Sequence, residues 1–195
     1  MPNLMVVIAS TRPIRAGLPV ARWFAGRAAE HPAFDVDLVD LAELDLPFMD
    51  EPEHPRLHRY VHEHTRRWSA RVAAADAFVF VTPEYNHGYS APLKNAIDFL
   101  HHEWEYKPVG FVSYGGVAAG TRAVQQLKPV VAVLRMTPLS DAVYIPFVQQ
   151  HLDGERAFRP PEEVDVAATA MLDALERYEA ALRPLRAPSG QPAVP

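Results

Sequence analysis

Apolar residues along this chain form short continuous runs, and these alternate with segments in which apolar residues recur at helical spacing. Continuous apolar runs of four to eight residues are typical of strands that are buried on both faces. We expect such strands over residues 4–9, 77–82, 109–114 and 142–145, and a fifth over residues 34–41, where apolar residues alternate imperfectly. Helical spacing predicts helices ending near residue 30 and over residues 57–75, 92–100, 121–134 and 164–182. The alternation predicts an α/β domain with a parallel sheet.

The connections in such a sheet are right-handed, so the expected architecture is a doubly wound three-layer sandwich. We expect the five-stranded parallel sheet to have the order 2-1-3-4-5, with helices on both faces. No repeat or change in composition divides the chain. We therefore predict one domain over residues 1–182, followed by a Pro-rich, disordered tail over residues 183–195.

Composition excludes several classes of function. The chain has 195 residues, no cysteine and a formal net charge of -5. The absence of cysteine excludes disulfides, thiolate metal sites and cysteine nucleophiles. The negative charge argues against a general nucleic-acid binder. Residues 1–9 do not resemble a signal peptide and no apolar run is long enough to cross a membrane, so we expect a cytoplasmic protein.

Three loops at the carboxyl ends of expected strands carry polar chemistry. The first, residues 10–17, offers hydroxyls, guanidiniums and backbone N–H groups just before a helix, which together suit a phosphate. It contains neither a Walker loop nor a dinucleotide fingerprint. An ordinary solvated loop with surface arginines is the alternative interpretation.

The second and third loops, residues 83–90 and 113–120, suit a planar ligand. Tyr85 can pack against a ring, Asn86 can bond to ring heteroatoms, and Gly115 and Gly116 allow close approach of the backbone. The alternatives are rim or interface aromatics in the second loop and a tight turn in the third. In the strand order 2-1-3-4-5 the first two loops flank one crevice and the third lies beside them. A phosphate end, a planar end and a close backbone wall together match flavin mononucleotide (FMN).

The same residues carry a family resemblance. Pro83-Glu84-Tyr85-Asn86, followed by the segment 93–98 (LKNAID), resembles the signature of the NADPH-dependent FMN reductase family. Ser10-x-Arg12 is similar to the phosphate loop of that family, and residues 113–116 to its third flavin loop. The resemblance implies a flavodoxin-like fold and transfer of hydride from NADPH or NADH to bound FMN. It also implies onward transfer to free flavin, a quinone or another small acceptor, and a homodimer or homotetramer.

The resemblance also implies the site residues. The phosphate-side candidates are Ser10, Thr11, Arg12 and Arg15. The isoalloxazine candidates are Pro83, Glu84, Tyr85, Asn86 and His87 along one edge, and Ser113, Tyr114, Gly115 and Gly116 along the other. No side chain needs to act as an acid, base or nucleophile, because the flavin carries the redox chemistry.

Three alternatives remain open at this point. A flavin-binding electron carrier without nicotinamide-dependent activity would use the same loops. His54, His58, His62 and His64 recur at short spacing, but a solvated helix face explains them better than a metal site. Phe99, Trp104 and Tyr106 either pack in the core or form a subunit interface near the helix that begins at Pro92.

Overall fold

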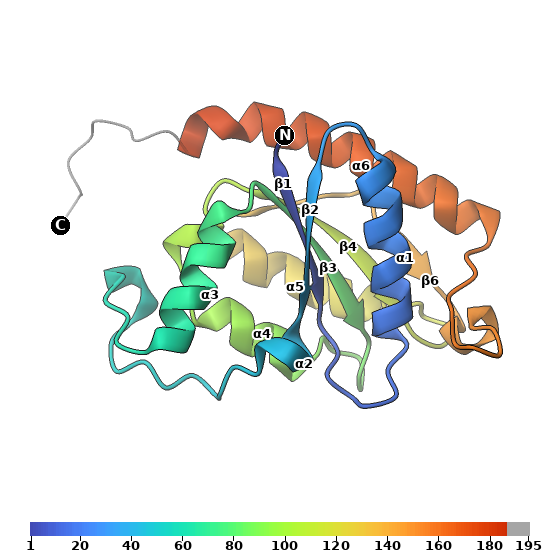
Figure 1. The fold of residues 1–195 in the computed structure, drawn as a ribbon, viewed down its shortest axis with the longest axis horizontal. Helices are drawn as coiled ribbons and strands as arrows, with labels where there is room; N and C mark the ends of the chain where they lie inside the picture. The colour runs from blue at the N-terminus through green and yellow to red at the C-terminus, as the bar shows by residue number, and fades with distance from the viewer. Residues whose placement is uncertain (187–195) are drawn as a thin grey trace.

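A parallel sheet lies at the centre of the structure, a computed structural model that describes residues 1–186 (Figure 1). The strands are β1 (Asn3–Ile8), β2 (Asp35–Asp40), β3 (Ala77–Pro83), β4 (Pro108–Tyr114), β5 (Thr137–Pro138) and β6 (Val143–Ile145). The order is β2-β1-β3-β4-β5, and β6 also pairs with β4. The predicted α/β fold and strand order are confirmed.

The fifth strand differs from its predicted form. In place of one strand over residues 142–145, two short pieces pair with β4, through Val109↔Pro138 and Val112↔Val143. The N–H of Leu139 still bonds to the carbonyl of Val109, after which the chain leaves the ladder until Val143. Pro138 lacks a backbone N–H and can end a ladder of this kind.

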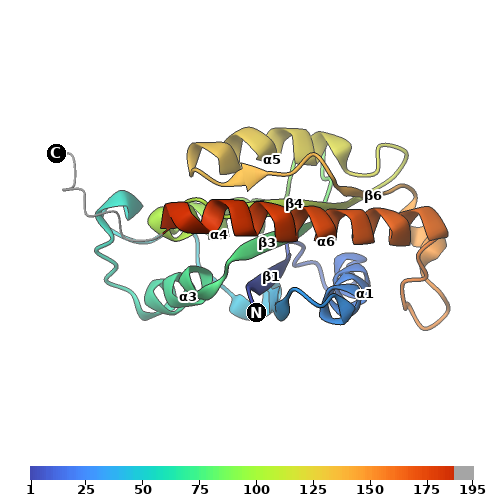
Figure 2. The same ribbon diagram turned by 90° about the horizontal axis from the view of Figure 1, so that it is seen from above.

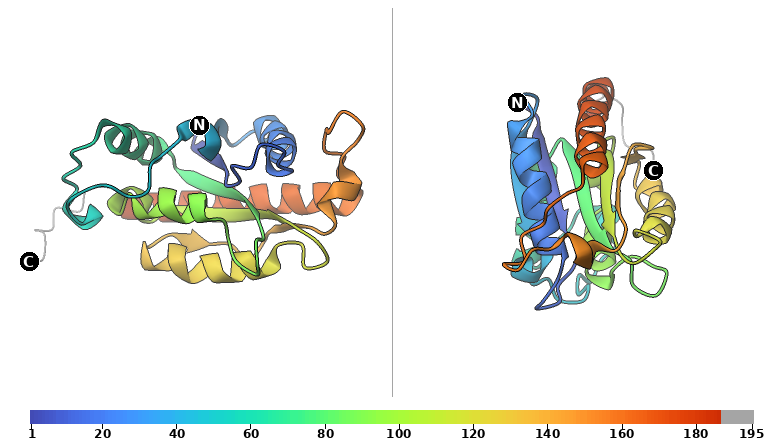
Figure 3. Two further views of the ribbon diagram at one scale, coloured as in Figure 1. Left: turned by 90° about the horizontal axis from the view of Figure 1, so that it is seen from below. Right: turned by 90° about the vertical axis from the view of Figure 1, so that its right-hand side faces the viewer.

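Helices cover both faces of the sheet (Figures 2 and 3). On one face α1 (Gly17–Glu30) and α6 (Glu162–Leu182) pack on alternate residues of β1, namely Leu4, Val6 and Ile8. On the other face α3 (Glu63–Ala74), α4 (Ala91–Asp98) and α5 (Thr121–Val133) cover Met5 and Val7. This alternation follows from the two-residue period of a strand and produces the three predicted layers.

The helix predicted over residues 57–75 is shorter than expected. A 3₁₀ turn (Pro55–Leu57) ends at His58, whose φ is 52°, and α3 begins only at Glu63. The Glu51 carboxylate accepts the N–H groups of Val61 and His62 at 2.8 and 3.1 Å, which holds this stretch extended. Val61 is therefore exposed and lies outside the helix. A similar shift occurs after β2, where Leu41 begins the short helix α2 (Leu41–Leu44) and does not end the strand.

The large apolar residues after α4 belong to the core. Phe99 and Trp104 are buried, and the Trp104 ring lies 5.0 Å from the Phe78 ring. The Trp104 indole N–H donates to the carbonyl of Ile97 at 3.2 Å. The possibility that Phe99 and Trp104 form a subunit interface is therefore wrong, since the core accounts for their bulk. Tyr106 is half-buried.

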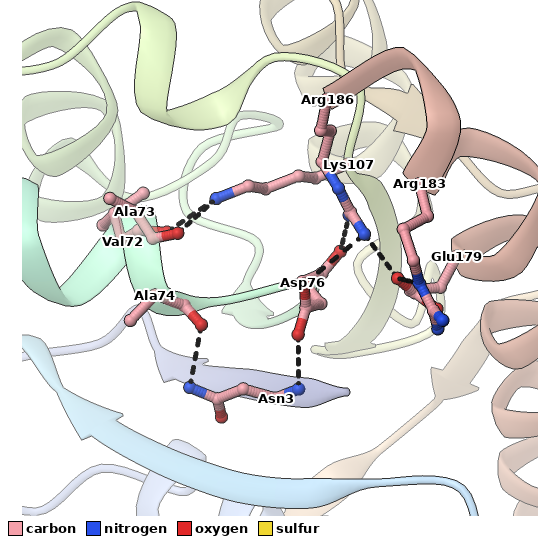
Figure 4. A network of polar contacts seen from close by, with 9 residues as sticks. All are labelled: Asn3, Val72, Ala73, Ala74, Asp76, Lys107, Glu179, Arg183 and Arg186. Carbon is pink, nitrogen blue, oxygen red and sulfur yellow. Dashed lines mark hydrogen bonds and ion pairs between the residues drawn. The ribbon is translucent and has the colours of Figure 1, made fainter. Parts of the chain in front are cut away.

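Residues 183–186, the first four of the predicted tail, are folded. Residues 183–186 form a short 3₁₀ helix, and the rest of the predicted tail lies outside the described residues. Arg186 donates to the carbonyl of Asp76 at 2.8 Å and pairs with the buried carboxylate of Glu179 (Figure 4). Asp76 in turn accepts the N–H of Asn3 at 2.8 Å. These bonds join the end of α6 to the edge of the sheet at which β1 and β3 begin, opposite the edge that carries the predicted site.

Candidate functional site: a pocket at the carboxyl edge of the sheet

A pocket of about 690 Å³ lies beyond the carboxyl ends of β1, β3, β4 and β6. The loops after β1 and β3 extend from this edge of the sheet, at the bottom of Figure 1. The volume is within the range of small-molecule and cofactor sites. Its lining residues are Arg12, Ile14, Arg15, Ala16, Pro83, Glu84, Tyr85, Tyr114, Gly115, Gly116, Phe147, Val148, Gln149, Gln150 and Arg156.

One end of the pocket is rich in hydrogen-bond donors. In the part of the chain that the structure describes, no backbone N–H of residues 10–12 or 14–16 donates a hydrogen bond. These groups directly precede α1, which has no acidic residue in its first turn and no side-chain cap. The Arg12 side chain is exposed and, within residues 1–186, forms no ion pair. Free amides at a helix N-terminus beside an unpaired guanidinium form an anion site.

Arg15 has a different environment from Arg12. Its guanidinium pairs with the carboxylate of Asp40 at the end of β2, and another nitrogen donates to the carbonyl of Arg12 at 3.3 Å. Its Nε is buried and has no hydrogen-bond partner among the described residues. Asp40 also accepts the N–H of Ala42, so it caps α2. Arg15 therefore positions the loop and leaves one buried donor unsatisfied.

The floor below the loop consists of Ser10, Gly17 and Tyr114. The Tyr114 hydroxyl donates to Ser10 Oγ at 3.0 Å, and both side chains are buried. Burial raises the pKa of Tyr114 well above its ordinary value, so the hydroxyl stays protonated. A Cβ at Gly17 would lie 2.3 Å from Ser10 Oγ and 2.4 Å from the Tyr114 hydroxyl. The close packing of these groups requires glycine at position 17.

The loop after β3 forms one wall, and Glu84 fixes it to the neighbouring helix. The Glu84 side chain is almost completely buried and accepts the backbone N–H of Arg122 at 3.2 Å, in the first turn of α5. The Arg122 guanidinium also pairs with the same carboxylate. A carboxylate at a helix N-terminus is a favourable arrangement. Glu84 thus holds Tyr85 in position against the pocket.

Asn86 and His87 occupy the tip of a tight turn. Tyr85 and Gly88 exchange two backbone hydrogen bonds of 2.9 Å, and the two central residues have φ angles of 50° and 69°. Such a turn favours asparagine and glycine at its central positions. The carbonyl of His87 accepts from Gln126 at 2.9 Å, which ties the tip to α5. The turn directs Asn86 and His87 away from the pocket lining.

The opposite wall of the pocket consists of the loops after β4 and β6, which are hydrogen-bonded to each other. The N–H groups of Phe147 and Val148 donate to the carbonyls of Gly116 and Gly115, each at 3.2 Å. Phe147 has a φ of 45°, a strained value for an aromatic residue, and such strain often accompanies binding sites. A Cβ at Gly116 would meet no atom within 4 Å, so this part of the wall is open.

The pocket brings together most of the residues predicted from sequence. Those in its lining are Arg12, Arg15, Pro83, Glu84, Tyr85, Tyr114, Gly115 and Gly116. Those outside the lining are Ser10 and Ser113, which are buried, Thr11, which faces a neighbouring cavity beside α2, and Asn86 and His87 at the turn. Ser113 donates to the carbonyl of Ala119 at 2.8 Å and shapes the third loop from below.

The sequence interpretation missed Phe147, Val148, Gln149, Gln150 and Arg156. They follow the last strand of the sheet, so the rule that pointed to the other three loops applies to them as well. The polar pair Gln149-Gln150, four residues after the end of the predicted strand, was the available signal. Arg156 lies farther along the chain, and only the folded loop brings it to the pocket.

The pocket fits FMN by the chemistry of its groups. The donor-rich end contains free amides, the Arg12 guanidinium and the unsatisfied Nε of Arg15, and it matches a single phosphate. The other end presents the Tyr85 side chain and the backbone of Gly115 and Gly116, which suits a flat heteroaromatic ring.

These features define a class of protein, a flavodoxin-like α/β domain with an anion site and a flat pocket at the switch point of the sheet. The sequence pattern of the family described as NADPH-dependent FMN reductase matches residues 2–150. The chain belongs to this family.

Individual relatives agree with this assignment. An NAD(P)H-dependent FMN reductase of Schizosaccharomyces pombe is 42% identical over 149 residues, which are 74% of each chain. An FMN-dependent NADPH-azoreductase of Staphylococcus saprophyticus is 27% identical over 131 residues, 67% of this chain and 69% of its own. Among solved structures, the flavoenzyme NAD(P)H:(acceptor) oxidoreductase FerB of Paracoccus denitrificans superposes with a TM-score of 0.74. That alignment covers 93% of this chain and 99% of FerB at 21% identity, so the likeness shows the fold.

Proposed function

We propose that the protein binds FMN in this pocket and uses NADPH or NADH to reduce a small acceptor such as free flavin, a quinone or an azo compound. The observation that carries the proposal is the pairing of an anion site at the N-terminus of α1 with a flat wall of Tyr85, Gly115 and Gly116. Relatives named FMN reductase, azoreductase and quinone oxidoreductase support the choice of acceptors.

Bound FMN would supply the redox chemistry by accepting hydride from a nicotinamide and passing two electrons to the acceptor. The protein chain binds the cofactor and holds it in position. Arg12 and the amides of residues 10–12 and 14–16 hold the phosphate, and the Ser10–Tyr114 hydrogen bond keeps the floor rigid. Glu84 fixes the wall that carries Tyr85, and the open side at Gly116 admits the two substrates.

The decisive experiment compares FMN with FAD by isothermal titration and by the visible spectrum of the purified protein. We expect tighter binding of FMN, because the pocket offers one anion site at the end of β1 and the chain has no dinucleotide fingerprint. The bound protein should then oxidise NADPH or NADH when a quinone is added. A colourless protein after incubation with FMN, or tighter binding of FAD, would contradict the proposal. Flavin binding without NAD(P)H oxidation would indicate an electron carrier.

Arg12→Ala should weaken FMN binding, and Arg67→Ala serves as its control. A charge-assisted contact to phosphate contributes about 1.5–3 kcal/mol, which corresponds to roughly a tenfold to hundredfold loss of affinity. Arg67 is exposed on α3 and lies outside the pocket lining. Equal FMN affinities for the two variants would show that the loop after β1 does not hold the phosphate.

We further propose that the protein forms a homodimer or homotetramer. Phe99 and Trp104 do not support this assembly, because they are core residues. The support comes instead from four exposed apolar side chains in the segment between α2 and α3, those of Phe48, Met49, Leu57 and Val61. Asn95 of α4 bonds to the carbonyl of Pro47 and to the N–H of Met49, which holds this segment against the helix.

A further inference from the structure

We propose that His101, His102 and Glu105 bind a divalent transition-metal ion. The three residues follow α4 at the edge of the sheet where β4 begins, opposite the edge that carries the flavin pocket. This site differs from the one that the histidine spacing suggested. His54 and His58 lie outside α3, and His62 and His64 stack on each other beside Asp50, so the four do not share one helical face.

The ligand atoms converge on one point. His102 Nδ1 lies 3.2 Å from Glu105 Oε1, and His101 Nε2 lies 3.9 Å from the same oxygen. One ligand atom from each residue lies within 4.8 Å of the others. Zn²⁺ binds imidazole and carboxylate at about 2.0–2.2 Å, which places neighbouring ligand atoms roughly 3–4 Å apart. A small rotation of the His101 ring would close the site.

The hydrogen bond at Nε2 of His102, the ring nitrogen that faces away from Glu105, is a second argument for a metal site. His102 Nε2 lies 2.9 Å from the carbonyl oxygen of Arg56, which can only accept, so Nε2 carries the hydrogen. Nδ1 faces a Glu105 carboxylate oxygen at 3.2 Å, an arrangement that needs either a proton or a metal ion between the two atoms. A metal ion between them satisfies both. A backbone carbonyl that holds the second ring nitrogen is a typical support for a metal-binding histidine.

The neighbours of the three residues leave the proposed metal site accessible, although one oxygen of the Glu105 carboxylate is already engaged. Arg135 approaches Glu105 Oε2 at 3.5 Å, which leaves Oε1 for the histidines. The side chains of His101 and Glu105 are mostly buried, whereas half of His102 is exposed. Water can therefore complete the coordination. Two imidazoles and one carboxylate are a ligand set that suits Zn²⁺ and its neighbours in the first transition row.

A bound ion would hold a long segment in place. His102 bonds to the carbonyl of Arg56, and the adjacent Glu103 accepts from the Tyr60 hydroxyl at 2.9 Å and lies 3.3 Å from His58. These contacts join residues 56–60 to the turn after α4. Fixing His102 would therefore strengthen the attachment of this segment, and binding to the folded state alone raises the unfolding temperature.

The test titrates Zn²⁺ into the full-length protein after removal of metals with EDTA. We expect one saturable site in calorimetry, an absorption spectrum of tetrahedral Co²⁺ when Co²⁺ replaces Zn²⁺, and a higher melting temperature with metal. His102→Ala and Glu105→Gln should each weaken Zn²⁺ binding at least tenfold and remove the thermal shift. The matched control is the double variant His62→Ala/His64→Ala, which removes two clustered histidines elsewhere and should bind Zn²⁺ like the wild type.

FMN binding by each variant separates loss of the metal site from loss of the fold. A variant that binds FMN normally but no longer binds Zn²⁺ supports the proposal. No saturable site in the wild type would overturn it, as would equal affinities in the wild type and both ligand variants. Loss of binding in the His62/His64 variant alone would place the metal at Asp50 instead and would also overturn it. Since the readout is metal affinity, failure here leaves the flavin proposal untouched.

Discussion

At the scale of single residues, Gly17 is the first residue of α1 and packs against Ser10 and Tyr114 in the pocket floor. Two side-chain oxygens, Ser10 Oγ and the Tyr114 hydroxyl, occupy the space that a Cβ would need. Gly26 in the same helix is exposed, and a Cβ there would meet nothing within 4 Å. A side chain at position 17 would therefore clash with the pocket floor, whereas position 26 has room for one.

Gly17→Ala should destabilise the protein by about 1–3 kcal/mol, because the new methyl group displaces the Ser10–Tyr114 hydrogen bond in a closely packed floor. Gly26→Ala should stabilise it by about 0.5–1 kcal/mol, since alanine is the better helix former. Urea unfolding of both variants measures the difference, and FMN titration shows whether the floor still supports the cofactor. Equal stabilities of the two variants would mean that the floor rearranges freely.

The sequence predicted the site at the level of loops better than at the level of single residues. Arg12, Tyr85 and Gly115 lie in the lining because the loops that follow β1, β3 and β4 meet at the carboxyl edge of the sheet. Asn86 carries the right chemistry but sits at a turn whose geometry directs it elsewhere. Ser10 and Ser113 are buried beneath the pocket and support its loops without lining it. Such differences depend on backbone angles and burial, which residue type alone does not specify.

At the scale of elements, the buried side chain of Lys107 connects α3 to the start of β4, near the end of α6. Lys107 is 6% exposed, and its ammonium donates to the last carbonyls of α3, those of Val72 and Ala73. Burial and the nearby Arg186 lower the pKa of Lys107 from 10.5 to about 8, although Asp76 and Glu103 oppose the shift. Figure 4 shows Lys107 in the same network as Glu179 and Arg186.

This pKa shift predicts that stability rises with pH above 8. Between pH 8 and 10.5 the folded protein has lost the Lys107 proton and the unfolded chain still holds it, so the unfolded state binds more protons. The full rise is roughly 3 kcal/mol from this group. Urea unfolding of the wild type and of Lys107→Met from pH 7 to 10 gives the contribution by difference. The curves of the two proteins should diverge above pH 8, and parallel curves would show that the pKa of Lys107 is unshifted.

The elements that the sequence predicted correctly have a strong and local signal. The runs that form β1, β3 and β4 are mostly apolar, and the spacing of Leu93, Ala96 and Ile97 marks α4. The errors lie where a distant contact decides the local structure. The start of α3 depends on the Glu51 carboxylate, which accepts the N–H of Val61 ten residues along the chain. The fold of residues 183–186 depends on Asp76.

At the scale of the whole molecule, the exposed apolar side chains are unevenly distributed. Phe48 is 87% exposed, and Met49, Leu57 and Val61 lie in the same segment between α2 and α3. Clusters of exposed apolar residues mark interaction surfaces more often than isolated ones do. No helix within residues 1–186 is long and apolar enough to span a membrane. The occupant that we propose for this surface is a second copy of the chain.

We expect light scattering of the purified protein to give at least twice the chain mass of 21.8 kDa. Phe48→Glu should shift the mass toward that of the monomer, because a carboxylate buried in an apolar interface loses its hydration without gaining a partner. Val133→Glu is the matched control, since Val133 is 76% exposed at the end of α5, outside this segment. The control should keep the mass of the wild type. If the wild type is a monomer at working concentration, the oligomer proposal is wrong. If both variants keep the wild-type mass, the interface lies elsewhere on the molecule.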